Sequence, residues 1–85
     1  MDKVALQGLI VEKLGARPAR LGLRASEITA DLDLVRSGVL DSLGFVDLIT
    51  ELETAVGKQV EFEKAFDRPG ATTVGGVIDL FLNDR

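Results

Sequence analysis

The stretch Gly38-Val39-Leu40-Asp41-Ser42-Leu43-Gly44-Phe45-Val46-Asp47-Leu48 joins a long polar connection to the start of a strongly patterned segment. From Phe45 onward the apolar residues recur at spacings of three and four, at Leu48, Ile49, Leu52 and Val56. At about 100° per residue these positions fall on one narrow stripe of a helix. The pattern therefore predicts a central helix that buries this stripe in a core.

Two further aliphatic residues, Leu43 and Val46, lie well off this stripe. They share a sector of the helix with Asp47 and lie close to Glu51 and Glu53. A helix that needed only to bury one face would have no use for aliphatic residues among acids on its outer side. Apolar patches ringed by negative charge are typical of a docking surface.

Ser42 lies at the predicted start of this helix, and spacing alone leaves two interpretations open. Asp and Ser are common helix N-caps because a side-chain oxygen accepts a hydrogen bond from an amide of the first turn. Asp41-Ser42 could therefore be a helix start and nothing else. In the alternative, Ser42 is a functional hydroxyl displayed at a helix end.

Composition limits the chemistry that the chain can perform. Eighty-five residues make a single domain, residues 1–85, with a modest core of three or four helices. The absence of Cys and His removes disulfides, thiolate metal sites and the usual general base, so we expect neither an enzyme nor a metal site. The first segment contains Asp2 and Glu12 and no long apolar run, which predicts neither a signal peptide nor a membrane span and favours the cytoplasm.

The charges are distributed unevenly around Ser42. The formal net charge is −4, but residues 1–30 carry three acids and five bases, whereas residues 31–63 carry eight acids against Arg36 and Lys58. Negative charge near Ser42 disfavours nucleic acid and favours basic surfaces on partner proteins. A solvated helix face is the alternative interpretation of the same charges.

The remaining elements follow from apolar spacing and from turn residues. Asp2 is a candidate N-cap for a first helix that ends near residue 14, before Gly15. A long connection follows over residues 16–40, with a short helical turn expected at Ser26–Ala30. Its apolar residues are expected to pin it across the bundle: Ile28, Leu32, Leu34, Val35, Val39 and Leu40.

Asp31-Leu32-Asp33 raises the question of a calcium loop, because alternate acids open such loops. The spacing excludes this interpretation, since counting from Asp31 puts Arg36 at the glycine position and Ser42 at the position of the bidentate Glu.

The C-terminal third predicts two more helices. Gly57 is a natural stop for the central helix. Val60, Phe62, Ala65 and Phe66 predict a short helical piece before Pro69-Gly70. Thr72 or Thr73 is expected to cap a last helix, which Gly75-Gly76 weakens by roughly 1 kcal/mol per Gly relative to Ala. Its predicted core stripe is Val74, Val77, Ile78, Phe81 and Leu82. The expected fold is all-α, with three main helices, a short fourth and a long first loop.

The string GVLDSLGFVDL resembles the attachment motif of acyl and peptidyl carrier proteins, in which a serine after an aspartate carries a 4'-phosphopantetheine arm. The resemblance covers nearly the whole chain and implies that Ser42 carries the arm, with coenzyme A as the donor. It implies that Asp41, Leu43, Val46, Asp47 and Glu53 form the surface read by partner enzymes. The implied partners are a phosphopantetheinyl transferase, an acyl- or aminoacyl-loading ligase, and downstream acyltransferases or synthases.

The chain departs from the fatty-acid-synthesis type of these carriers. Where that type often reads G-A-D-S-L followed by an acid, this chain reads Val39-Leu40-Asp41-Ser42-Leu43 followed by Gly44. The L-D-S-L-G form looks more like D-alanyl and other aminoacyl carriers, or carriers of specialised pathways. A monomeric carrier outside bulk fatty-acid synthesis is therefore expected, and an unmodified helical interaction module is the alternative.

Overall fold

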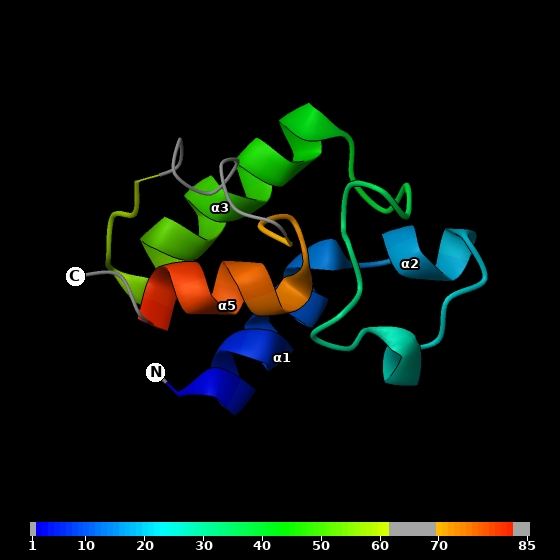
Figure 1. Cartoon of the computed structure of the whole chain (residues 1–85), viewed down its shortest axis with the longest axis horizontal. Helices are drawn as coiled ribbons and strands as arrows, with labels where there is room; N and C mark the ends of the chain where they lie inside the picture. Colours follow the sequence, from blue (N-terminus) through cyan, green and yellow to red (C-terminus); the bar gives the residue numbers. More distant parts are fainter. Residues whose placement is uncertain (1, 62–69, 83–85) are drawn as a thin grey trace.

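The computed structural model of the chain describes residues 2–61 and 70–82. Its main helices are α1 (Lys3–Leu14), α3 (Ser42–Val56) and α5 (Val74–Leu82), and the connection from α1 to α3 holds α2 (Arg17–Arg20) and a 3-10 turn, η1 (Ala25–Glu27). Helix α1 packs against both α3 and α5. Figure 1 shows α2 at the end of the molecule opposite the last turn of α5. The prediction of an all-α fold is confirmed.

The predicted helix ends are confirmed where the sequence offers clear caps. The Asp2 carboxylate accepts a hydrogen bond from the Ala5 amide at 2.8 Å, and α1 ends before Gly15. Helix α3 ends at Gly57, whose φ of 77° is left-handed and whose amide donates to the Glu53 carbonyl. Glycine has no Cβ atom and adopts the left-handed conformation without a steric penalty, which is why helices often end at this residue.

The core is made of apolar side chains from every main helix. The central stripe is buried at Phe45, Leu48, Ile49 and Leu52, while Val56 is half-buried against it. Helix α5 buries the predicted positions Val74, Val77, Ile78 and Phe81. The prediction for Leu82 is wrong, because this side chain is 40% exposed at the last turn of the helix.

The long connection is more structured than predicted. The short helical turn expected around Ser26–Ala30 is present, but it covers Ala25–Glu27 and so begins one residue earlier and ends three residues earlier. Helix α2 was not expected. In a sequence, Arg17-Pro18 can be taken for a helix break. Proline is nevertheless tolerated in the first turn of a helix, and Pro18 lies in the first turn of α2. The predicted anchors hold the connection to the core: Ile28, Leu34, Val39 and Leu40 are buried, and Leu32 and Val35 are half-buried.

Backbone contacts tie this connection to the start of α5. The Leu34 amide donates to the Thr72 carbonyl at 2.9 Å, and the Gly75 amide donates to the Ala30 carbonyl at 2.9 Å. A Cβ atom on Gly75 would lie 3.1 Å from that Ala30 oxygen, and one on Gly76 would overlap the Gly70 carbonyl oxygen. The two glycines therefore permit a close approach that compensates for their low helix propensity.

Thr73 rather than Thr72 caps α5. The Thr73 hydroxyl oxygen accepts a hydrogen bond from the Gly76 amide at 2.9 Å. The Thr72 hydroxyl instead donates to the Asp33 carboxylate at 2.8 Å. The short helical piece predicted from Val60 to Phe66 lies largely outside the described residues, although Val60 itself is half-buried and packs against the core.

Asp33 is a structural residue of the connection. Its carboxylate also accepts hydrogen bonds from the amides of Val35 and Arg36, at 3.0 and 2.8 Å. Burial raises the pKa of Asp33, but these bonds, the Thr72 hydroxyl and the charge of Arg36 outweigh burial and lower the pKa overall. A carboxylate already engaged in this way supports the conclusion from spacing that Asp31-Leu32-Asp33 is not a calcium loop.

We predict that the Asp33 network stabilises the domain only above acidic pH. Because the native pKa is lowered, the stabilisation is present above the ordinary aspartate pKa of about 4 and is lost as pH falls through the native value. In Asp33→Asn, denaturant melts near neutral pH should show a loss of about 1 kcal/mol. The difference from the parent should shrink below about pH 4, and a constant difference across pH would contradict this role.

Candidate functional site

The start of α3 is built around Asp41. The Asp41 carboxylate accepts a hydrogen bond from the Gly44 amide at 2.6 Å, so Asp41, not Ser42, is the N-cap. A Cβ atom on Gly44 would lie 3.1 Å from this carboxylate and 3.4 Å from the Leu40 side chain. Gly44 therefore leaves room for the cap, which gives this departure from the common carrier motif a local structural reason. The interpretation of Ser42 as a capping residue is wrong.

Ser42 is the first residue of α3, and its side chain is exposed. The residues just before it are held firmly, since Val39 is 6% exposed and Leu40 is 3% exposed. The Leu40 amide also donates to the Leu34 carbonyl at 2.8 Å. The first half of the motif is thus an anchor that presents the serine to solvent.

The predicted partner surface separates into two parts. Asp41, Leu43, Val46 and Asp47 lie at the first two turns of α3; Leu43 is 76% exposed, both aspartates are exposed and Val46 is half-buried. Glu53 lies farther along the helix and is half-buried, and its carboxylate accepts a hydrogen bond from the Val60 amide at 3.0 Å. Glu53 therefore holds the segment after α3 in place in addition to any contact with a partner.

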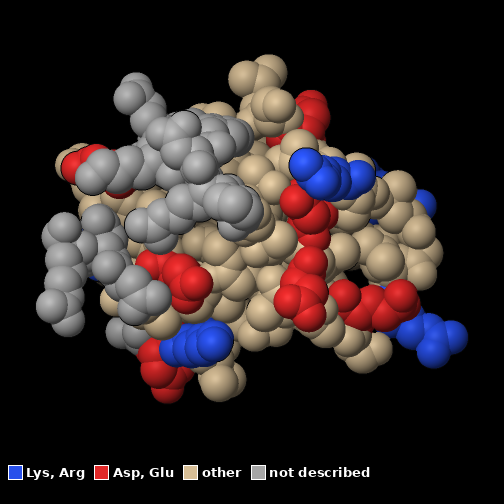
Figure 2. All heavy atoms as spheres, in the orientation of Figure 1, with Lys and Arg blue, Asp and Glu red and all other residues tan. Residues whose placement is uncertain are grey.

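Acidic side chains lie near the start of α3, and Arg17 and Arg20 of α2 face the same region. In Figure 2 acidic side chains form a column across this face that a basic side chain interrupts. The acidic side chains agree with the uneven charge of the sequence. Such a surface favours basic partner surfaces through complementary potential.

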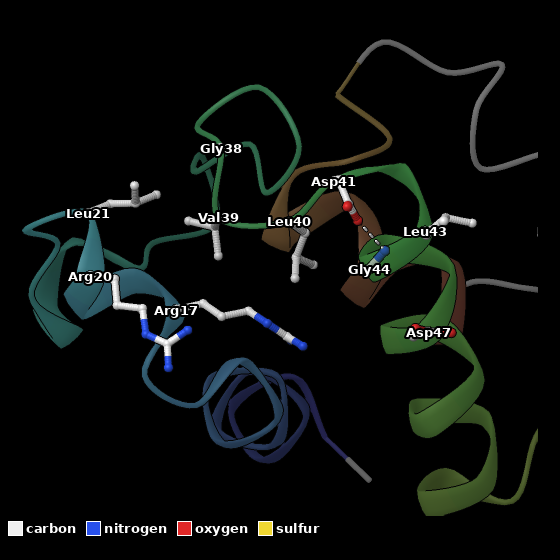
Figure 3. A pocket seen from close by; sticks show the side chains of 10 residues that line it. All are labelled: Arg17, Arg20, Leu21, Gly38, Val39, Leu40, Asp41, Leu43, Gly44 and Asp47. Atoms are coloured by element: carbon white, nitrogen blue, oxygen red, sulfur yellow. Dashed lines mark hydrogen bonds between the residues drawn. The ribbon is translucent and has the colours of Figure 1, made fainter.

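An open cleft of about 570 Å³ lies between α2 and the start of α3, and its lining includes Asp41 and Leu43, the chain neighbours of Ser42, but not Ser42 itself. Figure 3 shows Arg17 and Arg20 projecting from α2 on one side and Asp47 on α3 on the other. The lining residues are Arg17, Arg20, Leu21, Gly38, Val39, Leu40, Asp41, Leu43, Gly44 and Asp47. Sequence reasoning missed the part contributed by α2. The spacing of the two arginines around Pro18 was the available signal, since residues three apart share a helix face.

The site can accept a group but has no evident means to activate its own serine. The chain has no His and no Cys, so the usual bases beside a nucleophilic hydroxyl are lacking. Across residues 2–61 and 70–82, no cluster of three or more potential ligands could hold a metal ion. In the same residues no helix is long and apolar enough to cross a bilayer.

Comparison with known proteins decides the family. The family model described as a phosphopantetheine attachment site matches residues 5–80. The chain is also similar to an acyl carrier protein of Saccharopolyspora erythraea, with 39% identity over 64 residues, which is 75% of this chain and 64% of that protein. The chain thus matches less than two thirds of the length of this relative. No solved structure matches the chain.

The chain belongs to the family of proteins with a phosphopantetheine attachment site. Carriers of this family hold 4'-phosphopantetheine covalently and are not enzymes themselves. The described structure fits such a group, because an exposed hydroxyl stands at the start of α3 beside a cleft and behind a buried anchor. Helix N-termini also favour a nearby phosphate, since their free amides and dipole attract negative charge.

Proposed function

We propose that Ser42 carries the 4'-phosphopantetheine arm and that the arm holds acyl or aminoacyl groups as thioesters for partner enzymes. The observation that carries this proposal is the exposure of Ser42 at the first residue of α3, immediately after the buried anchor of Val39 and Leu40. The family match includes this position. The arm supplies the thiol that a chain without cysteine lacks.

The modification is proposed to be the work of a separate phosphopantetheinyl transferase with coenzyme A. The Ser42 oxygen would form a bond to the phosphorus that bears the pantetheine group, and the bond to the adenosine bisphosphate portion would break. The hydroxyl proton would leave to a base of the transferase, because the carrier offers no His or Cys beside Ser42. A loading ligase and downstream acyltransferases or synthases would then use the thioester.

Intact mass tests this function against the alternative of an unmodified interaction module. The chain is incubated with coenzyme A and a phosphopantetheinyl transferase, and then with an acyl donor and a loading enzyme. The proposal predicts one added arm and then one added acyl group that hydroxylamine removes. An unchanged mass with several transferases, combined with tight binding of a partner protein, would favour the interaction module.

The cargo is proposed to belong to a dedicated pathway rather than to bulk fatty-acid synthesis. The support is the L-D-S-L-G form of the motif, in which Gly44 follows Leu43 where the fatty-acid type continues with an acid. Gly44 also leaves room for the Asp41 cap, so its presence has a structural reason besides the cargo. The proposal is therefore tested by measuring which enzymes use the loaded carrier. Efficient elongation of the loaded carrier by a standard fatty-acid system would contradict this part of the proposal.

Asp47 is predicted to steer partner enzymes toward Ser42. Its exposed carboxylate lies one helical turn from Leu43. In Asp47→Lys, the rate of modification or acyl transfer at low salt should fall about tenfold, because steering by surface charge raises association rates by this order or more. The deficit should shrink toward 1 M salt, where the Debye length is about 3 Å.

The matched control for this prediction is Glu12→Lys, which makes the same charge change at an exposed site of α1 outside the cleft. Equal rates for Asp47→Lys and the parent at low salt, with several partners, would contradict the proposed surface. Glu53→Lys is a poorer test, since it also removes the acceptor of the Val60 amide.

A further inference from the structure

Two arginines of α2 line the cleft together with the residues that flank Ser42. We propose that Arg17 and Arg20 bind an oxyanion of the modified arm in this cleft. The oxyanion is either the phosphodiester of the arm or a carboxylate at the end of its cargo. This inference rests on the proposed function, because it requires the arm to be attached at Ser42.

The two guanidinium groups are presented from one side of an anchored turn. Arg17 and Arg20 are three residues apart in α2, which places them on the same helix face. Pro18 of the same turn is buried, and its carbonyl accepts a hydrogen bond from the Leu23 amide at 2.9 Å. The buried proline fixes the turn to the body, and Figure 3 shows the Arg17 side chain extending toward α3 with the Arg20 side chain beside α2.

Both arginines are free to take a ligand. Their side chains are exposed, and neither makes a hydrogen bond or ion pair within the part of the chain that the structure describes. Asp41, across the cleft, is engaged with the Gly44 amide. A free guanidinium offers five donors in a fixed fork that matches a phosphate or carboxylate group.

Attachment of the arm would create the need for such a partner. The phosphodiester introduces a negative charge directly beside Asp41, with Asp47 in the same cleft. The phosphodiester and the two aspartates repel one another because all are negative, and the positive charges of Arg17 and Arg20 offset that repulsion. Because the arm is tethered at the rim of the cleft, its effective concentration there reaches the millimolar range, so even a weak site fills.

The walls of the cleft combine charged and apolar side chains. Val39 and Leu40 line it but are only 6% and 3% exposed, whereas Leu21 and Leu43 line it and are 51% and 76% exposed. A second open cleft of about 340 Å³ shares Arg17 and Arg20 and adds Lys13 and Glu51. The two arginines are therefore the charged groups that both clefts have in common.

Arginine side-chain NMR on four forms of the carrier tests the proposal and separates the two sources of the oxyanion. The first two forms are the unmodified chain and the chain with the free arm. In the other two the arm is loaded with butyryl, which ends in a methyl group, or with succinyl, which ends in a carboxylate. If the phosphodiester is bound, the Nε signals of Arg17 and Arg20 shift on attachment of the arm and stay there with either cargo. If the carboxylate is bound, they shift only in the succinyl form.

Melting temperatures provide a second readout on variants. We compare the unmodified chain with the form whose attachment or loading shifts the arginine signals. At low salt the melting temperature of that form should be about 2 to 8 °C higher in the parent sequence. The double variant Arg17→Gln/Arg20→Gln should lose this increase. Arg24→Gln is the matched control, because Arg24 is exposed and lies outside both clefts.

The outcomes also distinguish this proposal from the function on which it rests. Intact mass is recorded for every sample. Absence of the arm would overturn the proposed function and this inference with it. Presence of the arm with unchanged Arg17 and Arg20 signals in every form, or an equal rise in melting temperature in the double variant, would overturn the oxyanion site alone.

Discussion

Replacing Ser42 with alanine is expected to abolish attachment of the 4'-phosphopantetheine arm while leaving the fold intact. The reason for the complete loss is chemical, because alanine has no oxygen to bond to phosphorus. The reason for the intact fold is structural, because the cap of α3 is the Asp41 carboxylate and Ser42 is an exposed first helical residue. Alanine is also a good helix former, so the free energy of unfolding should change by no more than about 0.5 kcal/mol.

This result is checked by intact mass after treatment with coenzyme A and a transferase, together with a denaturant melt of the same sample. Ser26→Ala and Ser37→Ala are the controls, because both remove an exposed serine hydroxyl outside the motif. Both controls should take up the arm as the parent does. Uptake by Ser42→Ala, or loss of uptake in either control, would contradict the assignment.

The second large effect is expected in the core of α3. Leu52 is fully buried, and truncation of a buried leucine to alanine costs about 2 to 5 kcal/mol because it removes apolar contacts and leaves a cavity. A domain of this size has only about 5 to 15 kcal/mol of stability in total. Leu52→Ala is therefore expected to be strongly destabilised or unfolded near room temperature.

Leu43→Ala is the matched control, since it is the same substitution on the same helix at a side chain that is 76% exposed. Its free energy of unfolding should stay within about 0.5 kcal/mol of the parent, while its modification or acyl transfer should be impaired. Val46→Ala should also impair transfer, with a small stability loss because Val46 is half-buried. Comparable destabilisation in Leu43→Ala and Leu52→Ala would refute the division of α3 into a core face and a docking face.

The helical framework could be predicted because its signals are local. Apolar residues at spacings of three and four marked the buried faces of α3 and α5, and Asp2, Gly15 and Gly57 marked helix ends. The connection was harder, because Pro18 is compatible with both a break and a first helical turn. Its course depends on tertiary bonds such as that from the Leu34 amide to the Thr72 carbonyl, which join residues far apart in the chain.

In the candidate site, too, some residues could be predicted from local signals and others could not. Ser42 and Leu43 were found from the motif and from their place off the core stripe, and both are exposed. The bond from the Val60 amide to Glu53 could not be predicted, because it depends on the path of the chain after α3. Arg17 and Arg20 reach the site only because the connection folds back toward α3, and no periodic pattern encodes that fold.

Locating the arm on the modified chain is the most direct test of the central claim. Cleavage after Arg36 and Lys58 releases a peptide of residues 37–58 that contains both Ser37 and Ser42, so fragment ions must separate the two. We expect the added mass of the arm on Ser42 in this peptide and nowhere else. An arm found on Ser37, on Ser26 or on a threonine would contradict it.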